Sequence, residues 1–388
     1  MNAKRDPNRR PREAAICLVT AAGLTVAACQ PAPPSSDTSP EMPSEPWTLE
    51  VPEPRTEDRI RVLIIHDMEG LTGQSDPTSF SFGTDLYPSG QEWLAGDINA
   101  VVDGLFAGGA TEVVIADGHG SGNPDPDLRT DLLDERATQI IRDEPFDTYF
   151  DLPESEEIDA VAVVGMHART GSGGFASHTF TLGIDLLING QAITETELVA
   201  LSWGRVGVPV IFASGDDRLR GDLQTMPWIE FVTVKDANGA DDAVTRPVPE
   251  ARADLREGAK RAVEKLTSAK AMRASPPIFA SLHAVPPASL RFLEGVPGVD
   301  YRDDTYTFLA GNMREAYDGL VAVVGLARVG YSSVLQEVVA ERADGGDIFA
   351  AYGDALRRRW FDQESGRYAR PEEGAGLAEG LRRFHGYR

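Results

Sequence analysis

The segment RVLIIH at residues 61–66, followed by DMEG at residues 67–70, decides the fold of this chain. A short run of β-branched and other apolar residues that stops at polar residues and glycine is typical of a buried strand in a parallel sheet. The same pattern recurs in EVVIADGHG at residues 112–120 and in IDAVAVVGMHA at residues 158–168. Each of the three runs ends on a residue type that binds metal ions.

The segments around these runs indicate an α/β fold, because strand-like and helix-like patterns alternate from residue 59 onward. Ser89 begins a capping-box pattern and predicts the start of a long helix. Asn189-Gly190 predicts a hairpin turn. We expect a mostly parallel sheet flanked by helices over residues 59–275, and a smaller α+β lobe over residues 276–330. A helical C-terminal extension is expected over residues 331–388.

The N-terminal region has the pattern of an exported protein. A basic start and a short apolar core predict a lipoprotein signal peptide over residues 1–28, and VAAC at residues 26–29 resembles a lipobox. Cleavage would leave Cys29 for lipidation, and the proline-rich residues 29–58 read as an extended tether. We therefore expect a cell-envelope lipoprotein, on the periplasmic side of the outer membrane. The alternative is a soluble protein secreted to the periplasm.

The net charge and the cysteine content limit the binding partners and the disulfides that we expect. The formal net charge of −24 predicts that the protein repels nucleic acid and anionic lipid surfaces. Membrane contact would then depend on lipidated Cys29 alone. The only other cysteine, Cys17, lies in the predicted signal peptide, so no disulfide is expected in the mature protein.

The ends of the three runs carry the candidate chemistry. Asp67 and Glu69 are two residues apart and would share a face of an extended segment. Such paired carboxylates are costly unless a cation neutralises them. His119 and His167 follow the other two runs, and ligands of parallel sheets gather at the carboxyl ends of strands. Carboxylates together with imidazoles suit Zn²⁺, with Mn²⁺ as the alternative.

These motifs carry a family resemblance. The segments that carry it are DMEG at 67–70, DGH at 117–119, GMHAR at 165–169, SH at 177–178 and GDD at 215–217. In order and spacing they resemble the motifs of the DppA-type D-aminopeptidases, over about residues 60–330. The resemblance implies two zinc ions per subunit, held by Asp67, Glu69, His119, His167 and one later glutamate, with Asp67 as the bridge. It also implies a homo-oligomer in the form of a decameric ring.

The later glutamate is either Glu195 or Glu197. Thr194 and Glu197 fit a capping box, in which Glu197 turns back to its own helix terminus. Glu195 is then free to face the metals, and the resemblance places the ligand there too.

His178 follows a glycine-rich loop at residues 171–177, which can bring an imidazole close to a substrate. The resemblance implies that His178 is catalytic as a nucleophile, and a general acid/base role is equally consistent with the residues. His66, His283 and His385 read as structural or surface residues. Asp216 and Asp217 read as caps of a loop.

The function that follows is a zinc-dependent aminopeptidase acting on short peptides with an N-terminal D-residue such as D-Ala. One alternative is a metal-dependent amidase on another substrate. The other is a non-catalytic lipoprotein that binds peptides or metal.

Overall fold

We describe the fold from a computed structural model, which covers residues 40–53, 59–123, 125–142, 146–296, 300–327 and 331–365. The predicted signal peptide, Cys29, most of the predicted tether and His385 lie outside these residues. Every element named below belongs to the compact unit that begins at Glu41.

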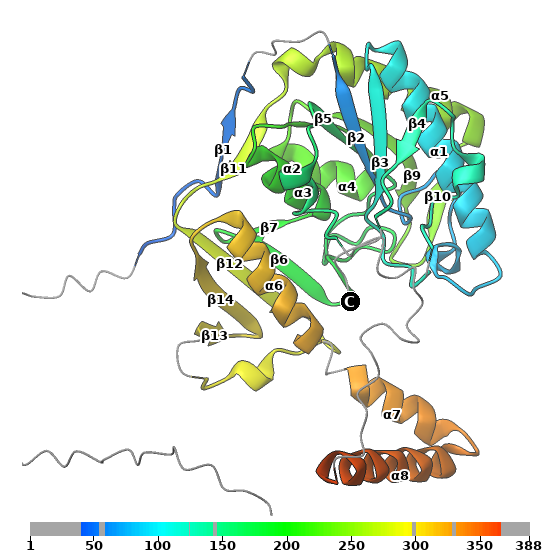
Figure 1. Ribbon diagram of the computed structural model, residues 1–388, viewed down its shortest axis with the longest axis vertical. Coiled ribbons are helices and arrows are strands. Elements are labelled where there is room, and N and C mark those ends of the chain that lie inside the picture. Colours follow the sequence, from blue (N-terminus) through cyan, green and yellow to red (C-terminus); the bar gives the residue numbers. More distant parts are fainter. Residues whose placement is uncertain are drawn as a thin grey trace, which may run out of the picture. The chain divides into compact units, whose positions relative to one another are not determined.

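A seven-stranded sheet forms the centre of the fold, in the spatial order β10-β9-β8-β5-β2-β3-β4 (Figure 1). All neighbouring pairs are parallel except β9 and β10. This confirms the predicted α/β fold with a mainly parallel sheet. The strands are β2 (Arg61–His66), β3 (Glu112–Asp117), β4 (Ala137–Gln139), β5 (Ala160–Val164), β8 (Val210–Asp216), β9 (Glu230–Ala237) and β10 (Ala243–Thr245).

Helices cover both faces of this sheet, which explains why its strands are almost wholly apolar. Val62 and Ile64 of β2 point into the core beneath α1 (Tyr87–Ala107) and α5 (Val248–Glu264), which pack against each other. Leu63 and Ile65 point into the opposite core, to which α2 (Leu152–Ser155), α3 (Glu195–Gly204) and α4 (Asp217–Asp222) contribute. The alternation of side chains along β2 thus supplies both cores.

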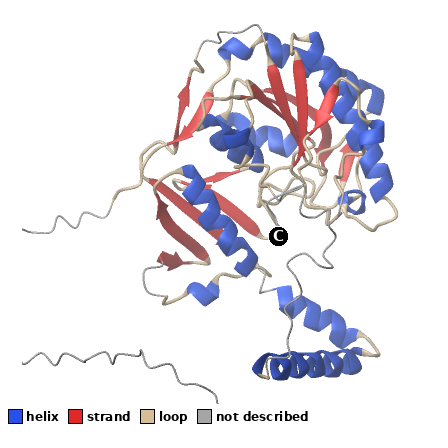
Figure 2. Cartoon of the chain, in the orientation of Figure 1, coloured by secondary structure: helices blue, strands red, loops and turns tan. Residues whose placement is uncertain are grey.

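A second sheet has five antiparallel strands in the order β13-β14-β12-β6-β7, with α6 (Met313–Ala327) packed on it (Figure 2). Its strands are β6 (Ile184–Ile188), β7 (Gln191–Ile193), β12 (Ile278–Ala284), β13 (Asp300–Arg302) and β14 (Thr305–Ala310). Since β6 and β7 come from the middle of the chain, residue 276 does not separate the two sheets. The predicted domain boundaries themselves stay predictions.

The remaining elements are short or lie at the ends of the described chain. A two-stranded sheet joins β1 (Trp47–Glu50) to β11 (Ala271–Ala274). The 3-10 helices are η1 (Pro77–Phe80), η2 (Thr130–Leu132), η3 (Leu223–Thr225), η4 (Leu266–Ser268) and η5 (Arg291–Leu293).

The expectation that Ser89 caps the first long helix is wrong. The helix α1 begins at Tyr87, and its N-cap residue Leu86 makes no side-chain hydrogen bond. Pro88 lies in the first turn, where the fixed φ of proline suits a helix and its missing N–H costs nothing. The helix therefore starts before Ser89, which lies inside it.

After α6 the described chain forms two helices, α7 (Tyr331–Glu341) and α8 (Gly345–Glu364), which contact each other. Many of their large apolar side chains are exposed: Val334, Leu335, Val338, Ile348, Phe349, Tyr352, Leu356 and Phe361. Within the part of the chain that the structure describes, one helical stretch, Met313–Glu341, is long and apolar enough to cross a membrane. Its first part is α6, which buries Leu320 and Val324 in the core.

The turn between β6 and β7 ties several segments together. Asn189 and Gly190 adopt φ values of 50° and 77°, as the predicted hairpin requires. The side chain of Asn189 donates to the carbonyls of Pro46 and Ser275 at 2.9 and 2.8 Å, and accepts from the amide of Phe279 at 2.8 Å.

Asn189→Ala should lower the free energy of unfolding by about 2–4 kcal/mol, because it removes three hydrogen bonds to backbone groups and forces alanine into the left-handed region. Urea denaturation measures this loss. Asn189→Gly, which removes the same hydrogen bonds but tolerates a positive φ, should cost about 1 kcal/mol less. Equal stability of Asn189→Ala and the unmodified chain would contradict the role given to this side chain.

Candidate metal centre

The order of the central strands brings the predicted ligands together. β2 lies between β3 and β5, so the segments that follow these three strands emerge side by side at the carboxyl edge of the sheet. Asp67 and Glu69 follow β2, His119 follows β3 and His167 follows β5. Glu195 approaches from the first turn of α3. All five are buried, with exposed fractions between 2% and 7%.

Two close approaches of the backbone keep these segments in place. A Cβ added to Gly70 would lie 2.0 Å from the carbonyl oxygen of Met166. Gly165 has a φ of +76°, and a Cβ there would lie 2.4 Å from the carbonyl oxygen of Asp67. Only glycine fits at these positions. The loops that carry Asp67 and His167 therefore lie directly against each other.

The five side chains form two groups of potential ligands that share one member. Asp67, Glu69 and His119 make the first group, and Asp67, His167 and Glu195 make the second. In the first, Nε2 of His119 lies 3.4 Å from Oε1 of Glu69. In the second, Nε2 of His167 lies 3.3 Å from Oδ2 of Asp67 and 3.5 Å from Oε1 of Glu195. Asp67 therefore belongs to both groups of potential ligands.

The residues fit a divalent metal. Nε2 of His167 is buried and has no hydrogen-bond partner among the described residues, although it lies beside two carboxylates. Nδ1 of the same ring lies 3.0 Å from the carbonyl oxygen of Ala168, so Nε2 is the ring nitrogen that can bind a metal. Buried carboxylates next to each other need a cation to compensate their charge. Zn²⁺ accepts this mixture of nitrogen and oxygen ligands.

The electrostatics of the two paired carboxylates differ. Burial and the charge of Glu69 raise the pKa of Asp67 to about 8. Burial also opposes the ionisation of Glu69, but the charge and hydrogen bond of His119 outweigh it and hold the pKa of Glu69 well below its usual value. In the second group, His167 and Tyr149 likewise outweigh burial and lower the pKa of Glu195 to about 2.

The two imidazoles hold protons when no metal is bound. Burial lowers the pKa of His119 and of His167, but neighbouring carboxylates raise both well above the usual value. For His119 these carboxylates are Glu69 and Asp127, and for His167 they are Asp67 and Glu195. A metal ion must displace these protons in order to bind.

The local structure distinguishes Glu195 from Glu197. The predicted capping box is present: the amide of Thr194 donates to Oε2 of Glu197 at 2.8 Å, and the amide of Glu197 donates to Oγ1 of Thr194 at 3.0 Å. Glu195 instead accepts hydrogen bonds from the hydroxyl of Tyr149 and the amide of Phe180, at 2.7 and 2.8 Å. Only Glu195 faces the ligand cluster.

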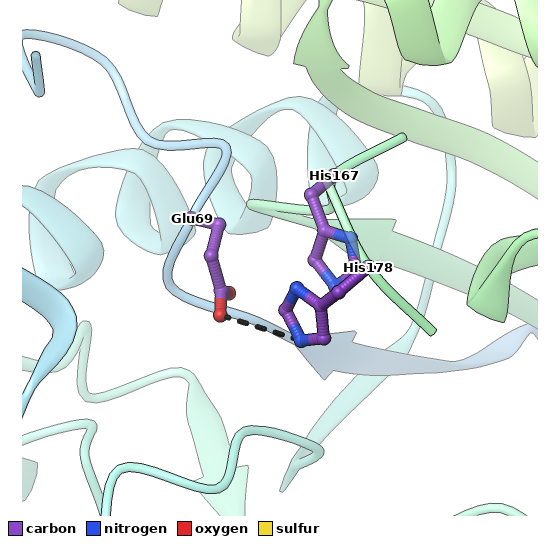
Figure 3. A group of neighbouring side chains, drawn as sticks. All are labelled: Glu69, His167 and His178. Carbon is purple, nitrogen blue, oxygen red and sulfur yellow. Dashed lines mark ion pairs between the residues drawn. The ribbon is translucent and has the colours of Figure 1, made fainter. Parts of the chain in front are cut away.

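His178 lies at the same centre. Its ring stacks on His167, with 4.0 Å between centroids, and its Nε2 lies 4.0 Å from Oε1 of Glu69 (Figure 3). Nδ1 lies 2.7 Å from the carbonyl oxygen of Ala176, so Nε2 faces the cluster. Burial and the neighbouring His167 lower the pKa of His178. The position fits a proton carrier or nucleophile, and it also fits a ligand, because Glu69, His167 and His178 form a third possible group.

The other residues singled out in the sequence lie away from the ligands or support them. His66 is fully buried, 3.8 Å from a carboxylate oxygen of Asp117, and burial lowers its pKa to about 3. His283 in β12 contacts Thr305. Asp216 caps the N-terminus of α4 by accepting a hydrogen bond from the amide of Leu219. Its second carboxylate oxygen accepts one from the amide of Phe175 at 2.8 Å. It thereby holds the loop that carries His178.

Three buried side chains at the centre were not found from the sequence. Asp127 contacts His119, Tyr149 contacts Glu195, and Lys235 donates to the backbone carbonyl of Glu69 at 2.5 Å. Burial lowers the pKa of Lys235 to about 7. Of the three, only Lys235 leaves a sign in the sequence, since it is a lysine within an apolar strand pattern. Burying a lysine costs free energy unless its ammonium group is bound.

Comparisons with known proteins identify the family and the fold of this chain. A sequence model of the peptidase M55 family, described as D-aminopeptidase, matches residues 60–322. The D-aminopeptidase of Bacillus subtilis (strain 168) is 26% identical over 266 residues, which are 67% of this chain and 95% of that protein. A solved structure is described as the Zn-dependent D-aminopeptidase DppA from Bacillus subtilis, a self-compartmentalizing protease. It has the same fold, with a TM-score of 0.62 and 24% identity over 69% of this chain and 98% of that chain.

The fold and the buried ligand cluster, together with these matches, define a hydrolase of the metallo-aminopeptidase class. The chain belongs to the D-aminopeptidase family, peptidase M55.

The pH dependence of metal binding follows from the pKa directions. Zinc affinity should rise with pH between about pH 6 and about pH 8, because the metal competes with protons on Asp67, His119 and His167, whose pKa values are raised. Competition with a chromophoric chelator at several pH values measures this slope. An affinity that stays constant or falls as the pH rises would contradict it.

A matched pair of variants tests the choice of glutamate. Glu195→Gln should bind less divalent metal than the unmodified chain, since it removes a charged ligand. Glu197→Gln should retain the metal content of the unmodified chain and cost only about 1 kcal/mol of helix capping. Elemental analysis after dialysis gives the metal content of each variant. Loss of metal from Glu197→Gln alone would transfer the ligand role to Glu197.

Proposed function

We propose that this chain removes N-terminal D-residues, such as D-Ala, from short peptides, with two zinc ions held by Asp67, Glu69, His119, His167 and Glu195. The observation that carries the proposal is the pair of buried ligand groups that share Asp67, in a chain of the D-aminopeptidase family. The relative and the solved structure, named as a D-aminopeptidase and as Zn-dependent, support the substrate class and the metal.

When bound, a zinc pair supplies polarisation of the scissile carbonyl and a water acidified toward neutral pH. The chain's own residues supply position and proton transfer. The negative charges of Asp67, Glu69 and Glu195 would offset most of the charge of two bound divalent ions. Burial of the ligands excludes bulk water and strengthens these interactions.

His178 is the residue best placed to move a proton at the scissile bond. The carbonyl oxygen of Ala176 accepts from Nδ1 and orients Nε2 toward Glu69 and the rest of the cluster. Ser172 and Phe175 anchor the loop through Asp222 and Asp216, at 2.6 and 2.8 Å. This anchoring supports either role for His178, as general acid/base or as nucleophile.

Rates on D-Ala and L-Ala p-nitroanilides, with and without chelator, test the proposed function. The D-substrate should be hydrolysed faster, and chelation should abolish the activity. His178→Ala should retain zinc but lose about 10²–10⁴-fold in kcat, the usual contribution of general acid/base catalysis.

Equal rates on both enantiomers would instead favour a metal-dependent amidase of broader specificity. Zinc binding without hydrolysis of either anilide or of a D-Ala dipeptide would favour a binding protein. Near-normal kcat in His178→Ala would remove His178 from the reaction.

We also infer that the chain forms a homo-oligomer that encloses its active sites. The description of the solved structure as self-compartmentalizing supports this inference. Light scattering of the chain from residue 30 onward gives the mass of the assembly, and a monomer would contradict it.

We further propose that lipidated Cys29 tethers the protein to the cell envelope. The support is the sequence pattern at residues 26–29 and the proline-rich segment that follows it. Cys29→Ser should move the protein from the membrane to the soluble fraction of lysed cells. A variant that is processed normally and yet sediments with membranes would contradict the tether, and would direct attention to Met313–Glu341.

A further inference from the structure

One buried carboxylate outside the five ligands contacts the metal centre directly. Asp127 is 2% exposed, and its Oδ2 lies 2.7 Å from Nδ1 of His119. The other ring nitrogen of His119, Nε2, lies 3.4 Å from Oε1 of Glu69. We propose that Asp127 is a positioning residue that orients His119 and selectively strengthens the metal position formed by Asp67, Glu69 and His119. The inference rests on the proposed function, because it concerns the same metal centre.

The hydrogen bond determines which nitrogen of His119 meets the metal. An ionised carboxylate only accepts hydrogen bonds, so Nδ1 carries a hydrogen and Nε2 is the nitrogen that can offer a lone pair to a metal. A carboxylate behind a ligating imidazole fixes the ring orientation and makes the facing nitrogen a stronger donor. Asp127 does both for His119.

Asp127 is itself held by three separate parts of the fold. Its Oδ1 accepts hydrogen bonds from the hydroxyl of Tyr87 in α1 and from Oγ of Ser121, the latter at 2.5 Å. Its amide donates to Oδ2 of Asp117, at the end of β3, at 2.8 Å. A carboxylate fixed from these directions cannot follow His119 if the ring rotates. The ring orientation is therefore set before any metal arrives.

The second metal position has a different environment. Nδ1 of His167 faces only the neutral carbonyl oxygen of Ala168. Glu195 accepts hydrogen bonds on both oxygens, from Tyr149 and from a backbone amide, and these donors withdraw charge from the ligand. At the first position Glu69 accepts one hydrogen bond, from the amide of Met68 at 3.2 Å, and Asp127 adds a negative charge behind His119. At the second position Glu195 accepts two hydrogen bonds, and a neutral carbonyl lies behind His167. The first position should therefore bind the metal more tightly.

Zinc titration of the full chain, by chelator competition, compares Asp127→Ala and Asp127→Asn with the unmodified protein. Asp127→Ala should lose about 10–100-fold in affinity for one ion, with the other ion unaffected. Asp127→Asn retains an acceptor for Nδ1 but not the charge, so its loss should be smaller. Cobalt(II) loaded in place of zinc should show an altered visible spectrum for one ion only.

A control is Glu230→Gln, which neutralises a partly buried carboxylate that pairs with Arg261 and Lys265 at the start of β9, at the opposite edge of the sheet from the five ligands. Both zinc affinities of this variant should equal those of the unmodified chain. Thermal melting of the metal-free proteins separates stability from metal binding. In Asp127→Asn, the rise in Tm on adding zinc should be smaller than in the unmodified chain. The Tm of the metal-free variant should differ from that of the metal-free unmodified chain by less than this amount.

Two results would overturn the inference while the proposed function stands. One is an Asp127→Asn protein with both zinc affinities within about twofold of the unmodified chain, well short of the usual effect of such a residue. The other is a loss of zinc affinity that is the same at both metal positions, together with a fall in Tm that is as large in the metal-free variant as in the zinc-loaded one. This result would show a purely structural role. An unmodified chain that binds no divalent metal would overturn the proposed function itself, and the role of Asp127 with it.

Discussion

The repulsion among Asp67, Glu69 and Glu195, buried around His119 and His167, is the constraint on which the rest of this structure depends. Such a cluster is costly unless positive charge compensates it. In the metal-free chain, protons on the imidazoles and on Asp67 supply part of that charge, as the raised pKa values of these groups indicate. A pair of divalent cations would replace the protons and leave every ligand in its charged or lone-pair form. Stability and function are therefore coupled through the same five side chains.

The fold holds this cluster together by strand order and by close packing of backbone. Because β2 lies between β3 and β5, the carboxylates of Asp67 and Glu69 that follow it lie close to the histidines that follow the two neighbouring strands. Gly70 and Gly165 let the adjoining loops touch without side chains between them. From farther away, α3 contributes Glu195, Asp216 at the end of β8 anchors the loop of His178, and β9 contributes Lys235. Each of these three elements thus contributes a ligand or a group that positions the ligands or the loop of His178.

Much of this arrangement could be predicted from the sequence, since it depends on local patterns. The apolar runs before Asp67, His119 and His167 define neighbouring strand ends, and the Thr194–Glu197 capping box separates Glu195 from Glu197. Asp127 and Tyr149 could not be found in this way, because they lie in irregular segments and reach the ligands only through tertiary packing. The prediction that Ser89 caps the helix was wrong for a related reason, because a proline in the first turn starts α1 earlier than the capping pattern suggests. Likewise, β6 and β7 join the second sheet by long-range pairing with β12, which no local pattern encodes.

The most direct test of the metal centre is anomalous diffraction at the zinc edge from crystals of the zinc-loaded chain. Two peaks are expected at the carboxyl edge of the central sheet, one beside Glu69 and His119 and one beside His167 and Glu195. Both should lie about 2.0–2.2 Å from carboxylate oxygens of Asp67, the normal zinc–oxygen distance. A single peak, or two peaks of which only one contacts Asp67, would contradict the shared-ligand arrangement.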